Sequence, residues 1–112
     1  MAKFEKTIIG SHPHLINQLE EDILHSGISM RVVEESIYVT PALRVITKVY
    51  DKYFMRNSSR ASLSLTIIED GRNTHVIAMA AGGSQGVIFN FSWGAESELV
   101  DTVRMTLEKL GY

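Results

Sequence analysis

The segment from Ser62 to Ala81 contains the pattern that most constrains the fold, because it has the alternation and the turn of an antiparallel β-hairpin. Polar and apolar residues alternate over 62–68, and Asp70-Gly71 then supplies a two-residue turn that requires positive φ. This turn predicts that Leu65 pairs with Val76. The residues expected on the core face are Leu63, Leu65, Ile67, Val76, Ala78 and Ala80.

The opposite face of the same hairpin also carries several apolar side chains. We expect His75 to lie opposite Thr66 there, beside Ile68, Ile77 and Met79. A face of this kind needs cover, because exposed apolar patches usually mark interfaces. The sequence therefore predicts that a helix or a second copy of the chain, in a homodimer, covers this face.

Two helical patterns flank the strands. The first has an apolar stripe from Leu15 to Ile23, with Ser11 expected as its N-cap and Gly27 expected to end it in a left-handed conformation. The second covers residues 94–110, and Gly111 is expected to end it. Each helical pattern has one apolar stripe, with charged residues mostly on the other side.

Strand patterns occupy most of the remaining chain. They are expected at residues 3–9, 28–33, 37–39, 42–54, 62–68, 73–81 and 87–91. The order is a strand, a helix, about four to five antiparallel strands and a C-terminal helix, which indicates the α+β class. A sheet gripping the last helix is similar to a reduced helix-grip arrangement.

Composition narrows the class of protein further. The chain has 112 residues and 45% apolar residues, which predicts one α+β domain over residues 1–112. Its net charge of -2 gives no reason to expect a nucleic-acid or membrane partner, since both require a basic surface, and we expect neither. It has no cysteine, and charged residues at Lys3, Glu5 and Lys6 do not fit a signal peptide. We therefore expect a cytoplasmic protein.

The glycine-rich segment from Gly82 to Gly86 contains Ser84 in the G-x-S-x-G pattern of a hydrolase nucleophile. That chemistry needs a histidine later in the chain, but all four histidines precede Ser84. A phosphate-binding P-loop would need a lysine here, and none is present. We therefore favour a sharp bend. The alternative is a small enzyme or phosphate-binding protein that uses Ser84 and Gln85, with Arg60 or His75 as a further polar group.

No set of residues forms a coherent catalytic or metal site. His12 and His14 are two residues apart and diverge on a helix, whereas metal ligands on helices are usually three or four apart. We predict no catalytic residue, no metal site and no cofactor.

A basic strip next to Tyr50 and Tyr53 has the composition of an anion or nucleic-acid surface, but solvated charges paired across a sheet explain it adequately. The strip comprises Arg44, Lys48, Arg56 and Arg60. Tyr38, Tyr50, Tyr53, Phe89 and Phe91 are expected either to line a cavity under the helix or to fill the core. Trp93 precedes the last helix and is expected either to stack on a ligand or to pack against the core. The candidate ligand-binding residues are Ser84, Gln85, Trp93, Tyr50, Tyr53 and Arg60.

Several short motifs, in their order and spacing, resemble an uncharacterised family of short bacterial cytosolic proteins, a domain of unknown function. They are His25-Ser26-Gly27-Ile28-Ser29, Arg44-Val45 through Val49-Tyr50 to Tyr53, Arg60-x-Ser62-Leu63-x-Leu65-Thr66, Gly82-Gly83-Ser84-Gln85 and Trp93-Gly94-x-Glu96. The resemblance implies a bacterial cytosolic protein and brings no assigned activity. The sequence thus favours a non-enzymatic domain that binds a small apolar ligand or a protein partner, as a homodimer.

Overall fold

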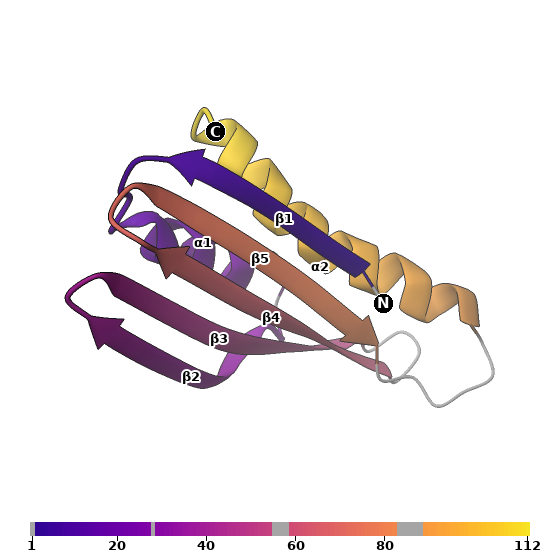
Figure 1. Cartoon of the computed structure of the whole chain (residues 1–112). Coiled ribbons are helices and arrows are strands. Elements are labelled where there is room, and N and C mark those ends of the chain that lie inside the picture. Colours follow the sequence, from indigo (N-terminus) through magenta and orange to yellow (C-terminus); the bar gives the residue numbers. More distant parts are fainter. Residues whose placement is uncertain (1, 28, 55–58, 83–88) are drawn as a thin grey trace.

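The computed structural model describes residues 2–27, 29–54, 59–82 and 89–112 and has an α+β fold, as the sequence predicts. The elements are β1 (Ala2–Ile9), α1 (Leu15–Leu24), β2 (Arg31–Thr40), β3 (Leu43–Phe54), β4 (Ser59–Glu69), β5 (Asn73–Gly82) and α2 (Phe89–Lys109). The strands form one antiparallel five-stranded sheet in the order β1-β5-β4-β3-β2 (Figure 1).

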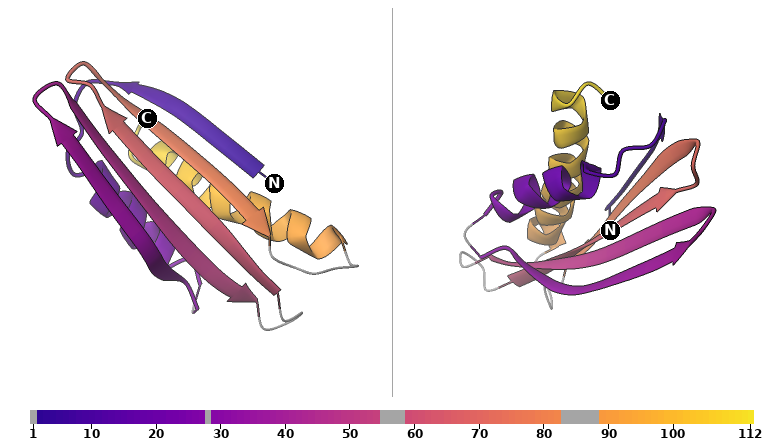
Figure 2. Two further views of the ribbon diagram at one scale, coloured as in Figure 1. Left: turned by 60° about the horizontal axis from the view of Figure 1, so that its bottom comes forward. Right: turned by 90° about the vertical axis from the view of Figure 1, so that its left-hand side faces the viewer.

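Both helices lie on the same face of the sheet, and the other face, here called the outer face, carries neither of them (Figure 2). Side chains alternate between the two faces because successive residues of a strand point in opposite directions. The helix-covered face holds the hydrophobic core, which includes Tyr50 of β3, Leu19 of α1 and Val103 of α2. The core residues predicted for the β4–β5 hairpin are confirmed: Leu63, Leu65, Ile67, Val76, Ala78 and Ala80 are at most 1% exposed.

The pairing predicted inside this hairpin is wrong by two residues. Leu65 pairs with Ala78, and His75 lies opposite Ile68 instead of Thr66. The turn lies one residue later than predicted, at Gly71-Arg72, because the Asp70 N–H donates to the main-chain oxygen of Asn73 at 3.2 Å. The Asp70 carboxylate also accepts main-chain hydrogen bonds from Arg72 (2.9 Å) and Asn73 (2.7 Å). A shift of two residues returns each side chain to the same face, so the predicted faces survive.

The first helix begins later than expected. Its N-cap is His14, and its first residue is Leu15, so the prediction of Ser11 as N-cap is wrong. The main-chain oxygen of His12 accepts a hydrogen bond from the Leu15 N–H at 3.1 Å, which makes residues 12–15 a turn before the helix. Gly27 does not have a positive φ, and the helix already ends at Leu24.

The second helix begins earlier than expected. Phe89–Phe91 is its first part, so the strand predicted over residues 87–91 is wrong for these three residues, and 87–88 lie outside the described residues. A short apolar run does not distinguish a strand from a helix, because buried strands and buried helix segments both have this pattern. The predicted end is confirmed by Gly111, which has a φ of +93°.

Strand β2 is continuous from Arg31 to Thr40, whereas two separate strand segments were expected. It contains a β-bulge. Val32 pairs with Tyr50 of β3, and Glu34, two residues further along β2, pairs with Val49, which is adjacent to Tyr50. Val33 is the extra residue of this bulge. A bulge increases the local twist and redirects neighbouring side chains, which matters for the site described next.

Candidate functional site

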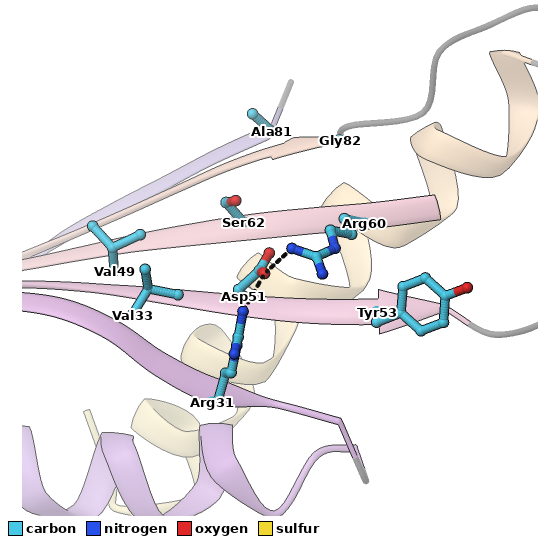
Figure 3. A pocket seen from close by; sticks show the side chains of 9 residues that line it. All are labelled: Arg31, Val33, Val49, Asp51, Tyr53, Arg60, Ser62, Ala81 and Gly82. Carbon is cyan, nitrogen blue, oxygen red and sulfur yellow. Dashed lines mark hydrogen bonds and ion pairs between the residues drawn. The ribbon is translucent and has the colours of Figure 1, made fainter. Parts of the chain in front are cut away.

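A hollow of about 580 Å³ lies on the outer face of the sheet, near the N-terminal end of β4 (Figure 3). Its volume is within the range of about 300–1,000 Å³ that small-molecule sites occupy. Its lining residues are Arg31, Val33, Val49, Asp51, Tyr53, Arg60, Ser62, Ala81 and Gly82. Strands β2, β3, β4 and β5 therefore all contribute to one surface depression.

Two arginines converge on one carboxylate at the centre of this hollow. Asp51 Oδ2 lies 3.3 Å from Arg60 Nη1 and 3.8 Å from Arg31 Nη2 (Figure 3). The side chain of Asp51 is 14% exposed, but those of Arg31 and Arg60 are 65% and 60% exposed. Each guanidinium has five N–H donors, which exceeds what one shared carboxylate oxygen can accept. The cluster of Arg31, Asp51 and Arg60 therefore has one excess positive charge and donors that face solvent.

Apolar side chains lie beside these charges. Val33, the bulge residue, and Val49 line the hollow, and they lie next to each other in Figure 3. Val33 is 52% exposed, so it presents an accessible apolar surface. A hollow with guanidinium donors on one side and aliphatic surface on the other suits a ligand with an anionic group and an apolar part.

The structure brings together two of the residues proposed from the sequence. Tyr53 and Arg60 both line the hollow, and they are cross-strand partners on β3 and β4. Tyr50 points to the other face, is fully buried and donates a hydrogen bond to Glu20, so it contributes to the core. Ser84, Gln85 and Trp93 lie outside the residues whose side chains are described.

Sequence reasoning missed Arg31 and Asp51 as members of the site. The alternation of side chains along β3 already places Asp51 on the same face as Val49 and Tyr53, so Asp51 could have been assigned to the site from the sequence. Arg31 could not be assigned in the same way, because the bulge at Val33 breaks the two-residue period that relates Arg31 to the rest of β2.

A second polar cluster lies on the outer face, where β1 pairs with β5. His75 Nδ1 is 2.6 Å from the Thr7 hydroxyl, and its Nε2 is 3.3 Å from Glu5 Oε1. Hydrogen bonds from Lys3 and then His75 lower the pKa of Glu5. This order of hydroxyl, imidazole and carboxylate is that of a nucleophile with its base. Thr7 and His75 are cross-strand partners on the exposed β1–β5 pair, and the hydrogen bonds among Thr7, His75 and Glu5 connect the two strands.

His12, which lies just before α1, has structural partners. His12 Nδ1 lies 3.0 Å from the Tyr112 hydroxyl, and its Nε2 lies 3.0 Å from the main-chain oxygen of Ile9. Among residues 2–27, 29–54, 59–82 and 89–112, no group of three or more histidine or acidic side chains is arranged to hold a metal ion.

Neither described helix combines the length and apolar character needed to cross a membrane. A search of the curated proteins finds no match to the chain, and a search of the solved structures finds none either. One family model matches residues 1–111. Since this match covers nearly the whole chain, and the sequence motifs resemble a domain of unknown function, the chain belongs to the family of unknown function DUF6054.

Proposed function

We propose that this protein is a non-enzymatic binding domain, and that its ligand is a small molecule with an anionic group and an apolar part. The observation that supports the proposal is the convergence of Arg31 and Arg60 on Asp51 next to the aliphatic surface of Val33 and Val49. Charge-assisted hydrogen bonds from arginine orient a carboxylate or phosphate, and the valines contact the apolar part.

The sharing of Asp51 makes both arginines available to a ligand. The two arginines are 65% and 60% exposed, and ion pairs of such exposed cations stabilise a protein by only about 0–1 kcal/mol, so a ligand anion competes with Asp51 at low cost. The hollow also reaches Gly82, where the glycine-rich segment begins. Gly82 is therefore shared by the small-ligand hypothesis and the phosphate-binding alternative.

Isothermal titration calorimetry with decanoate and, separately, with inorganic phosphate tests the proposal. The wild-type protein should bind decanoate more tightly than phosphate, because phosphate lacks the apolar part. The double substitution Arg31→Gln with Arg60→Gln should weaken decanoate binding at least about tenfold, which corresponds to about 1.4 kcal/mol. Asp51→Asn should strengthen it, because the competing carboxylate is lost.

Arg72→Gln is the matched control, because Arg72 is exposed in the β4–β5 turn and carries the same charge. Decanoate binding by this variant should equal that of the wild type. Absence of binding of both probes to the wild-type protein would disprove the proposed ligand class. Equal loss of binding in the control would show a nonspecific charge effect.

We also propose a bacterial cytoplasmic location. The absence of cysteine is compatible with a reducing compartment, where disulfides rarely form. Immunoblotting of fractionated cells should find the protein in the cytoplasmic fraction. Recovery in the periplasmic or membrane fraction would contradict the proposal.

A further inference from the structure

Strand β2 forms one edge of the sheet and carries three exposed apolar residues in succession. Ile37, Tyr38 and Val39 are 57%, 61% and 63% exposed. Ile37 pairs with Ile46 of the core, so Ile37 and Val39 belong to the helix-covered face, and Tyr38 belongs to the outer face. A partner that docks on one face would leave the other face uncovered. An added β-strand contacts side chains on both faces.

The main-chain groups of this edge are also oriented for strand addition. Thr40 and Leu43 are cross-strand partners that flank a two-residue turn, so we infer that they form the closing hydrogen-bonded pair of the ladder. Hydrogen-bonded and non-hydrogen-bonded pairs alternate in an antiparallel ladder, so the main-chain groups of Glu35, Ile37 and Val39 point towards the open edge. The N–H of Glu35 agrees with this assignment, because it donates to its neighbour's side chain, Glu34 Oε1, at 3.0 Å.

The opposite edge of the sheet is protected by charge. Strand β1 exposes Lys3, Glu5 and Lys6, and Lys3 Nζ lies 3.1 Å from Glu5 Oε2. Charged side chains on an edge strand oppose pairing with another strand. In β2, the regular segment between the bulge and the turn, Glu34–Thr40, has charges only in its first two residues. The unprotected edge is therefore β2.

We propose that β2 pairs with β2 of a second copy of this chain, in antiparallel orientation, around a two-fold axis at Ile37. Ile37 is the midpoint of Glu34–Thr40, so this register uses the whole regular segment. It places Ile37 opposite its own copy and Glu35 opposite Val39. An axis at Glu35 would instead place two glutamates opposite each other, which is destabilising. The result is one continuous sheet across the dimer, and it does not depend on a ligand in the outer-face hollow.

Sedimentation velocity of the full chain at micromolar concentration tests the dimer. The wild type should have twice the chain mass of 12.5 kDa. Ile37→Lys and Ile37→Pro should both have the monomer mass. Proline at this position removes an N–H that points to the open edge, so the β2–β3 ladder keeps its hydrogen bonds. Circular dichroism should show that both variants are folded.

Ile9→Lys is the control, because Ile9 is 87% exposed on β1, the other edge. This variant should remain a dimer. The chain has no cysteine, so Ile37→Cys introduces a single thiol that should form an intermolecular disulfide under mild oxidation. Ser36→Cys, which lies away from its own copy in this register, should cross-link more slowly. A monomeric wild type, a dimer unaffected by Ile37→Lys, or equal cross-linking of the two cysteine variants would overturn the proposal.

Discussion

The hydroxyl of Tyr50 donates a hydrogen bond of 2.9 Å to Glu20 Oε1, and this bond connects α1 to β3. The same oxygen lies 2.9 Å from Lys48 Nζ, which also lies 3.2 Å from Glu35 Oε2. Burial raises the pKa of Tyr50 far above its usual value, and the hydrogen bond to Glu20 raises it further. Burial alone would lower the pKa of Lys48, but the two glutamates outweigh burial and raise it. Tyr50 is thus a neutral donor to a carboxylate that also binds a cation.

Tyr50→Phe should lower the free energy of unfolding by about 1 kcal/mol, because it removes one buried hydrogen bond and keeps the ring. Glu20→Ala should cost about 2 kcal/mol or more, because it removes the acceptor of both Tyr50 and Lys48. Urea unfolding at neutral pH measures both values. Tyr53→Phe, on a ring that is 39% exposed, is the control and should lie within about 0.5 kcal/mol of the wild type. Equal stability of Tyr50→Phe and Tyr53→Phe would contradict a structural role for the bond.

The stability contribution of Asp22 should depend on pH. Asp22 Oδ2 of α1 lies 2.7 Å from Lys109 Nζ and accepts a hydrogen bond of 2.7 Å from Thr106, so it connects α1 to the end of α2. The hydrogen bonds from Lys109 and then Thr106 lower the pKa of Asp22 below 3.8. A carboxyl whose pKa is lowered by folding stabilises the folded state above its unfolded pKa. The contribution is lost as pH falls through the lowered value.

Asp22→Asn should therefore cost about 0.5–1 kcal/mol at neutral pH, a magnitude typical of a partly exposed ion pair. The difference from the wild type should begin to shrink near about pH 4 and become small at lower pH. Urea unfolding as a function of pH measures this difference. Glu21→Gln is the control, because Glu21 is exposed and changes charge equally. A difference that grows as the pH falls would have the wrong sign for this linkage.

Glycine is required at position 71 by the backbone conformation, and not because a side chain would lack space there. Its φ is +89°, and a Cβ placed there would meet no atom within 4 Å. Gly71→Ala should cost about 1–2 kcal/mol, because an L-residue is strained in this conformation. Gly71→Asn should cost less, since asparagine tolerates positive φ. Thermal unfolding of the two variants distinguishes backbone strain from steric conflict. A larger cost for the bigger asparagine would indicate conflict with neighbouring atoms.

Local patterns in the sequence predicted the strands and the faces of the central hairpin well. The alternation from Leu63 to Ile67 determines which side chains are buried, and an error of two residues in the register leaves that result unchanged. Gly111 was also readable as the end of the last helix, because glycine is favoured where φ is positive. These features depend on residues close together in the chain.

Tertiary structure decided the role of single side chains. Tyr50 and Tyr53 have the same aromatic character and lie three residues apart, but one is buried against Glu20 and the other lines the outer hollow. Alternation places the two tyrosines on opposite faces of the sheet. Only the tertiary structure shows that both helices cover the face of Tyr50.

The sequence by itself determined the α+β class, the strand pattern and the apolar faces, because these follow from periodicity and turn chemistry. Only the tertiary structure decided that Arg31 and Arg60 meet at Asp51 and that β2 is left as an open edge. Both depend on strand order, and the pairing of Arg31 with Asp51 also depends on the bulge at Val33. The physical reason is that such contacts join residues distant in sequence, and each segment's local pattern is equally compatible with several strand orders.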